Sequence, residues 1–210
     1  MKSYKTVKAD GSCEMIERKS RFIGHCRPVK TQDEAIAFIN EIRSLHRQAS
    51  HNVYAYVLRE DNISRYSDDG EPAGTAGVPV LEVINKEGLT DICVVVTRYF
   101  GGILLGAGGL VRAYGKSAGL GIDASGKIEM VPCSIYVIHC DYSTYGKIDY
   151  AVKEAGYFVK DVSFANDVCL TVGIPEGDEN SFKKTVSDIS GGSAAMQQIS
   201  GEYIIKDASK

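Results

Sequence analysis

The sequence predicts an α+β protein in which two domains follow one another along 210 residues. The length exceeds that of one usual compact domain but is short for three. Strand-like alternation and helical spacing succeed one another along the chain. From Ser134 to Ile205 their order is βαββαβ, the ferredoxin-like arrangement, which can bury a core of its own. We expect the boundary near Met130, giving domains at residues 1–130 and 131–210.

The first domain is expected to open with strands and an amphipathic helix. Apolar residues between Tyr4 and Ile16 flank a turn at Asp10-Gly11 and predict a hairpin, and Arg21 to Val29 reads as a further strand. A capping box, Thr31 to Glu34, precedes apolar residues at helical spacing. A helix therefore follows, with an apolar face made of Ala35, Ile36, Ile39, Ile42 and Leu45.

The middle of the chain reads as a hairpin, a short helix, a buried strand and a longer helix. The hairpin joins Val53–Leu58 to Ile63–Ser67, and Pro79–Asn85 forms the end of the short helix. Ile92–Thr97 is a β-branched run typical of a strand buried on both faces. The longer helix should run from about Gly109 to Leu120 and end at Gly121.

The second domain alternates regularly between strands and helices, with Gly156 and Gly191-Gly192 ending the helices. Strands are expected at Ser134–Cys140, Tyr157–Phe164, Val168–Ile174 and Ala194–Ile205, and helices at Tyr145–Ala155 and Asn180–Ile189.

Composition points to a cytoplasmic globular protein. The chain is 44% apolar and 24% charged, as in ordinary globular domains. Its six cysteines form no CxxC pair and do not cluster with histidine, so no zinc or other metal site and no cofactor is expected. No apolar stretch resembles a signal peptide or reaches the roughly 18 residues of a membrane span. We therefore expect reduced cysteines and no contact with membranes.

Charge is distributed unevenly along the chain. Residues 1–130 hold 17 basic and 16 acidic residues, whereas residues 131–210 hold 7 and 11. All nine arginines lie in the first part. Because guanidinium binds phosphate and carboxylate through paired hydrogen bonds, anion recognition is expected in the first part.

The run Arg98–Tyr114, RYFGGILLGAGGLVRAY, is the leading candidate site. Its glycines permit positive φ and close approach of a ligand, and the helix start that follows supplies free N–H groups. The alternative is that the glycines only allow a helix to pack closely on a strand. Apolar Ile103–Leu105 either anchors the loop or meets a partner. The predicted anion-binding or nucleic-acid-binding residues are Arg98, Gly101, Gly102, Gly106, Gly108, Gly109, Arg112 and Lys116.

The loop Ser67–Gly77 is an accessory candidate through Asp68, Asp69, Glu71 and Thr75. Its carboxylates could hold Mg²⁺ or act as a base near a bound phosphate. The alternative is purely local, since Asp and Gly form turns and Thr75 would cap a short helix. We assign no catalytic residue. His51, just before a predicted strand, either faces the ligand or packs.

Four motifs together resemble the YigZ/IMPACT family: KSRFIG at 19–24, HNVYAY at 51–56, DDGEPAGTAGVP at 68–79, and the glycine-rich run. The resemblance implies a first domain similar to the second domain of ribosomal protein S5, and a second similar to the last domain of elongation factor G. It also implies a role in translation, where eukaryotic IMPACT restrains an amino-acid-starvation kinase pathway. Because this chain begins at the shared domain, we expect it to lack the amino-terminal partner-binding domain of IMPACT.

These observations lead us to expect a noncatalytic or weakly catalytic translation-associated regulator that binds RNA, or a ribosome-associated protein, through the glycine-rich run. Two alternatives remain open. One is an enzyme acting on a nucleotide or phosphorylated metabolite, with Asp69 or Glu71 holding Mg²⁺ or acting as a base. The other is a protein-interaction module that uses Ile103–Leu105.

Overall fold

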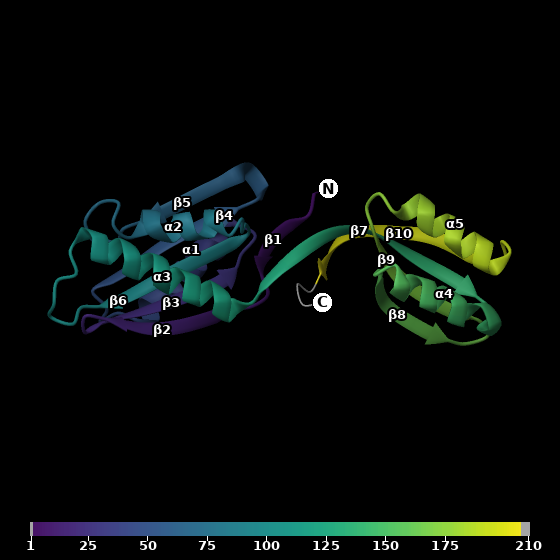
Figure 1. Cartoon of the computed structure of the whole chain (residues 1–210), viewed down its shortest axis with the longest axis horizontal. Coiled ribbons are helices and arrows are strands. Elements are labelled where there is room, and N and C mark those ends of the chain that lie inside the picture. Colours follow the sequence, from purple (N-terminus) through teal and green to yellow (C-terminus); the bar gives the residue numbers. More distant parts are fainter. Residues whose placement is uncertain (1, 207–210) are drawn as a thin grey trace. The chain divides into compact units, whose positions relative to one another are not determined.

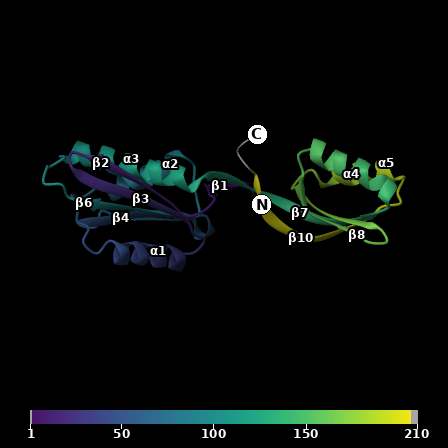
Figure 2. The same cartoon turned by 90° about the horizontal axis from the view of Figure 1, so that it is seen from below.

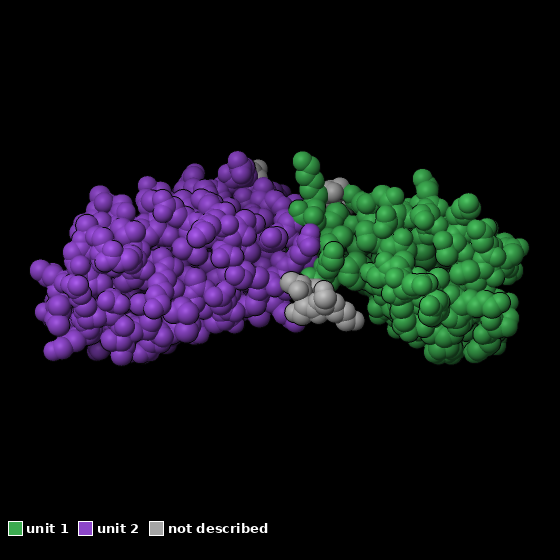
Figure 3. All heavy atoms as spheres, viewed as in Figure 1, with its two compact units in different colours: residues 1–3, 130–206 green, residues 4–129, 207–210 purple. Residues whose placement is uncertain are grey.

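The computed structural model describes residues 2–206, apart from the side chain of Asp61. The predicted α+β class is confirmed (Figure 1). Contacts divide the chain into two compact units (Figure 3). We call Tyr4–Glu129 the amino-terminal unit, and residues 2–3 with Met130–Lys206 the carboxy-terminal unit. In residues 2–206, no helix combines the length and hydropathy needed to cross a membrane.

An antiparallel five-stranded sheet forms the centre of the amino-terminal unit. Its order is β2 (Gly11–Glu17), β3 (Ser20–Pro28), β6 (Ile92–Tyr99), β4 (His51–Leu58) and β5 (Ile63–Ser67). Strand β6 lies in the middle and is buried from Ile92 through Arg98, as its β-branched run predicts. The 3₁₀ turn Glu60–Asn62 joins β4 to β5, which confirms that hairpin.

Helices cover both faces of this sheet (Figure 2). Helix α1 (Gln32–Leu45) lies on one face, and α2 (Gly77–Lys86) and α3 (Ala107–Ser125) lie on the other. The capping box of α1 is present, with Thr31 and Glu34 bonding each other's backbone amides. Its buried face uses Phe38 in addition to three predicted residues, whereas Ile36 and Leu45, which we expected to be buried, are 42% and 71% exposed.

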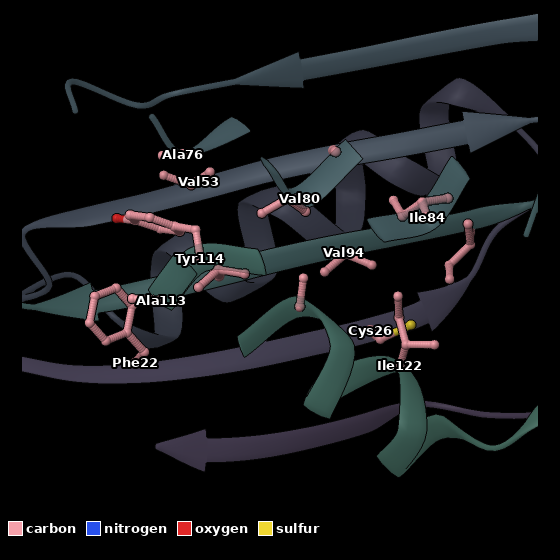
Figure 4. Packing of buried hydrophobic residues seen from close by; sticks show 14 of the residues in the cluster. Phe22, Cys26, Val53, Ala76, Val80, Ile84, Val94, Ala113, Tyr114 and Ile122 are labelled. Atoms are coloured by element: carbon pink, nitrogen blue, oxygen red, sulfur yellow. The ribbon is translucent and has the colours of Figure 1, made fainter. Parts of the chain in front are cut away.

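The main core lies between the sheet and helices α2 and α3 (Figure 4). Phe22, from β3, meets Tyr114, from α3, with perpendicular rings whose centroids are 5.3 Å apart. Val80 and Ile84 of α2 belong to the same buried cluster. Each fully buried side chain of this size contributes about 1.5–3 kcal/mol through removal of apolar surface from water.

The hairpin predicted at the amino terminus is wrong. Strand β1 (Tyr4–Val7) pairs with β7 and not with β2. The real hairpin joins β2 to β3 through Arg18 and Lys19, whose φ angles of 44° and 65° are left-handed. Gly11, read as a turn residue, lies inside β2, where a Cβ would come within 2.5 Å of the Ser125 nitrogen. Close packing on α3 therefore explains that glycine.

Helix α3 starts two residues before the predicted Gly109 and ends five residues after the predicted Leu120. Gly121 does not end it, because a Cβ there would lie 2.8 Å from the Gly24 carbonyl oxygen. The residue allows the helix to approach β3 closely. The helix ends instead at Gly126, whose φ is 70°. Helix α2 spans Gly77–Lys86, so the predicted Pro79–Asn85 segment is indeed helical and forms most of the helix.

The carboxy-terminal unit has the predicted βαββαβ order, confirming its ferredoxin-like arrangement. Its sheet order is β10 (Ala195–Lys206), β7 (Lys127–Cys140), β9 (Val168–Pro175) and β8 (Phe158–Phe164), with β7 beginning before the unit boundary. Helices α4 (Tyr142–Glu154) and α5 (Glu179–Ser190) lie on one face (Figure 2). Ile148, Val152, Phe182 and Val186 of these helices pack on the strands.

Candidate anion site and adjoining polar cluster

The glycine-rich run forms an irregular segment at residues 100–106, between β6 and α3. Gly102 and Gly106 have φ angles of 81° and 72°, which residues with a Cβ rarely adopt. Gly101 has a different reason, since a Cβ there would overlap the Lys19 carbonyl in the β2–β3 turn. The segment therefore needs glycine partly for backbone conformation and partly for packing on this turn.

A hollow of about 200 Å³ lies beside this segment. Arg112 and Lys116, one turn apart on α3, line one side, and Arg18 of the β2–β3 turn also lines it. The remaining lining residues are Met15, Glu17, Leu105, Gly109 and Ala113. The structure thus brings together two of the three predicted cations and adds Arg18, which was missed because the turn was placed elsewhere.

The start of α3 lies at the hollow. Leu110 donates the first intrahelical hydrogen bond, to the Gly106 carbonyl at 2.9 Å. The amide of Gly109 precedes that bond and therefore has no acceptor in the preceding turn. Gly109 lines the hollow, and at Gly108 a Cβ would lie 3.8 Å from Arg112 Nη1. Cations and a helix start therefore converge at this position, which suits an anion.

Arg98 belongs to a different environment. It is 5% exposed, and its Nη1 donates to Glu71 Oε1 at 2.6 Å. The Tyr114 hydroxyl donates to the same oxygen at 2.8 Å, and Arg98 Nη2 donates to Ser20 Oγ at 3.4 Å. This arrangement corrects our picture of Arg98 as a third cation flanking the loop: its charge is buried against a carboxylate.

His51 completes what we call the polar cluster: Ser20, His51, Glu71, Arg98 and Tyr114. His51 is the cross-strand partner of Arg98, and its Nδ1 lies 2.8 Å from the Asp69 carbonyl oxygen. Its Nε2 lies 3.8 Å from Glu71 Oε1. Burial, together with the neighbouring Glu71 carboxylate, raises the pKa of Tyr114 well above its usual value, so its hydroxyl stays a donor.

The accessory residues mostly support their own loop. Asp68 Oδ1 accepts from the amides of Ala76 and Gly77, at 3.1 and 2.8 Å, at the start of α2. Burial raises the pKa of Asp68, but bonds from these amides and from Gly74 outweigh it and lower the pKa. Thr75, offered as a cap, instead donates to the Pro72 carbonyl at 2.7 Å.

Asp69 and Glu71 already have partners. Asp69 Oδ1 accepts from Arg43 Nη2 at 2.8 Å, and its Oδ2 accepts from the Asn52 amide at 2.6 Å. Glu71 serves Arg98 and Tyr114. Across residues 2–206, no group of three or more His, Cys, Asp or Glu residues is placed to hold a metal ion.

The segment itself carries several exposed apolar side chains. Phe100, Ile103 and Leu104 are 48%, 40% and 81% exposed, whereas Leu105 is 8% exposed and reaches the core. The two predicted roles for Ile103–Leu105, anchoring the loop or meeting a partner, therefore apply to different residues. Leu105 anchors the segment, whereas Ile103 and Leu104 are exposed.

Comparison with known proteins shows where the chain belongs. Residues 18–122 match the Impact N-terminal domain, and residues 138–193 match a domain of unknown function, DUF1949. The IMPACT family member YvyE of Bacillus subtilis is 42% identical over 97% of this chain and 94% of that protein. The chain belongs to the IMPACT family. Another IMPACT family member, YigZ of Escherichia coli, is 34% identical over 87% of this chain and 91% of its own length.

Other IMPACT relatives match over different extents. Protein IMPACT of Bos taurus is 35% identical over 46% of this chain and 32% of its own length. A solved structure described as a hypothetical protein shares 32% identity and a TM-score of 0.60, covering 95% of this chain and 98% of the other. The polar cluster of this IMPACT chain draws one residue or more from each of the four motifs that carry the resemblance.

Proposed function

We propose that this chain is a translation-associated regulator whose amino-terminal unit binds RNA. The supporting observation is the hollow in which Arg18, Arg112 and Lys116 converge beside the Gly109 amide. None of the three forms an ion pair within residues 2–206, so their charge is available to a ligand. Phosphate contacts of this kind dominate nucleic-acid affinity. Arg98 is outside this proposal because Glu71 neutralises it.

Salt dependence tests the electrostatic part. Three phosphate contacts to single-stranded RNA predict that log K falls with log salt at a slope of about −2, hence roughly 20-fold weaker binding at 200 mM than at 50 mM salt. Fluorescence anisotropy with a labelled oligonucleotide measures this directly. Affinity that does not change with salt would rule out the proposed contacts.

Charge removal locates the binding surface. Arg112→Gln should weaken binding to all sequences alike and reduce the salt slope by about 0.7. Arg65→Gln is the matched control, because Arg65 is also exposed in the amino-terminal unit but lies on β5, away from the hollow. Equal losses in the two variants would show only a general charge effect.

The translation part is tested on ribosomes. We expect the protein to sediment with ribosomes in lysate and Arg112→Gln to lower the bound fraction. Wild-type protein that stays in the supernatant at low salt would separate RNA binding from any role at the ribosome.

A protein-interaction module is the second candidate, favoured by the exposure of Leu104 and Ile103. It predicts a partner that remains bound after nuclease treatment and is lost in Leu104→Ser, a change that leaves Arg112 and Lys116 in place. The Mg²⁺-dependent enzyme gains no such support, since Asp69 and Glu71 are already hydrogen-bonded.

A further inference from the structure

The charge of the hollow is specific enough to suggest which phosphate it takes. Its lining holds three cations, Arg18, Arg112 and Lys116, and one carboxylate, Glu17, which leaves two positive charges in excess. A phosphodiester inside an RNA strand carries one negative charge. A terminal phosphomonoester carries between 1.5 and 2 near pH 7, about one half to one charge more. The excess charge of the lining therefore matches the terminal group.

The shape of the hollow favours the same group. The cations come from two elements, the β2–β3 turn and helix α3, so a ligand between them is contacted from two sides. Met15, Leu105 and Ala113 supply apolar surface within it. A terminal phosphate has one covalent attachment and can enter a recess of about 200 Å³ end-on. An internal phosphate has nucleotides attached on both sides, and the hollow would have to admit both of these attachments.

Hydrogen-bond geometry adds a further match. A phosphomonoester presents three terminal oxygens, whereas an internal diester presents two. Arg112, Lys116 and Gly109 line the hollow together with Arg18. Each can donate hydrogen bonds, the first two from their side chains and Gly109 from its backbone amide. Charge-assisted bonds of this type are among the stronger polar contacts. A third terminal oxygen would therefore find a donor that a diester leaves unused.

We infer that the hollow binds a terminal phosphomonoester, such as the phosphorylated end of an RNA fragment. This inference rests on the proposed function, which names RNA as the ligand. It goes further by stating that the hollow binds the end of the RNA strand. Arg18, Arg112, Lys116 and the Gly109 amide are the donors, and Glu17 limits the affinity.

The test compares three forms of one ten-nucleotide RNA that differ only at the 5′ end: hydroxyl, phosphate, and phosphate methyl ester. The ester keeps the phosphorus but has one ionisable oxygen fewer. We expect full-length protein to bind the phosphate form about tenfold more tightly than the other two, the effect of one further charge-assisted hydrogen bond. Inorganic phosphate should compete with the 5′-phosphate for the hollow and so reduce this difference in affinity. A 3′-phosphorylated RNA shows whether a phosphate at either end is accepted.

Variants assign the preference to the hollow. Arg112→Gln and Arg18→Asn should abolish it, the latter with asparagine because this residue type tolerates the left-handed φ of 44°. Glu17→Gln should raise affinity for the phosphate form several-fold, an outcome that a damaged fold would not produce. Arg65→Gln should leave the preference unchanged.

The outcomes separate the inference from the proposed function. Equal, salt-dependent binding of all three RNAs, weakened by Arg112→Gln, would overturn the terminal-phosphate inference and leave RNA binding standing. A preference for phosphate that survives Arg112→Gln would place the site elsewhere and overturn the inference too. Binding of none of the RNAs would remove both.

Discussion

Replacing Glu71 with glutamine should remove a large part of the stability of the amino-terminal unit. The Glu71 and Arg98 side chains are 4% and 6% exposed, and their ion pair is 2.6 Å long. Glutamine retains an oxygen for Tyr114 but removes the negative charge. The guanidinium of Arg98 would then be buried without a counter-charge, in contact only with neutral oxygens of the glutamine and of Ser20, the latter at 3.4 Å. Breaking a buried pair in this way costs about 3–5 kcal/mol, against 0–1 kcal/mol for a pair in solvent.

Buried thiols allow this loss to be measured in one unit of the intact chain. Cys26 and Cys93 of the amino-terminal unit are 0% exposed, and so is Cys133 of the carboxy-terminal unit. A short pulse of a thiol reagent in increasing urea, read by mass spectrometry, gives an unfolding midpoint for each cysteine. With a urea slope of about 2 kcal/mol per molar, Glu71→Gln should lower the Cys26 and Cys93 midpoints by about 2 M.

The double variant separates charge from general damage. Adding Arg98→Met to Glu71→Gln removes the unpaired cation, so the midpoint should recover most of the loss. A single variant that costs less than 1 kcal/mol would refute the reasoning, because it would mean that water reaches the pair. Failure of the double variant to recover would show that shape, and not charge, is what Glu71 supplies.

Three further predictions concern His25, Gly121 and Asp68. Burial, with a smaller effect of His46, lowers the pKa of His25 to about 4. The protein should therefore be fully stabilised above about pH 6.5 and lose about 3 kcal/mol of unfolding free energy as the pH falls to 4. Urea midpoints should fall accordingly, and His25→Phe should make them depend less on pH. Gly121→Ala should cost about 1–3 kcal/mol by thermal unfolding, since its Cβ would meet the Gly24 carbonyl, whereas Gly119→Ala, with open space, should stabilise by about 1 kcal/mol. Asp68→Ala should cost about 1–2 kcal/mol, because it removes the hydrogen-bond acceptor at the start of α2. An unchanged unfolding midpoint would mean that water replaces this acceptor.

Local sequence signals predicted much of the fold. The Thr31 capping box and the β-branched run Ile92–Thr97 gave the correct element types, because both patterns act within a few residues. Glycine was harder to interpret. The local sequence predicts a turn at Gly11 and a helix end at Gly121, yet both are glycine because another segment's backbone lies against them. Nothing local distinguishes a glycine needed for conformation from one needed for space.

The candidate site shows the same division. Arg112 and Lys116 could be paired from their spacing of four on one helix. The hydrogen bond from Arg98 to Glu71 joins residues that are 27 positions apart in the sequence. No local pattern connects the two, so chemical type alone predicts separate roles for them. Arg18 could have been found through a two-residue turn between β2 and β3. Its neighbours there are not the usual glycine or asparagine, so the signal was absent.

The polar cluster connects the elements that line the hollow, although no cluster residue lines it. Ser20, which directly follows the Arg18-Lys19 turn, accepts bonds from the Gly101 amide at 3.3 Å and from Arg98. Tyr114, two residues after Arg112, is held by Glu71. One wall of the hollow is therefore fixed through Ser20 and the other through Tyr114, and Arg98 and Glu71 join them. A buried ion pair is a costly way to gain stability, because both charges lose their hydration. Here the pair joins the hydrogen bond of Ser20 to that of Tyr114, and so connects the β2–β3 turn to helix α3.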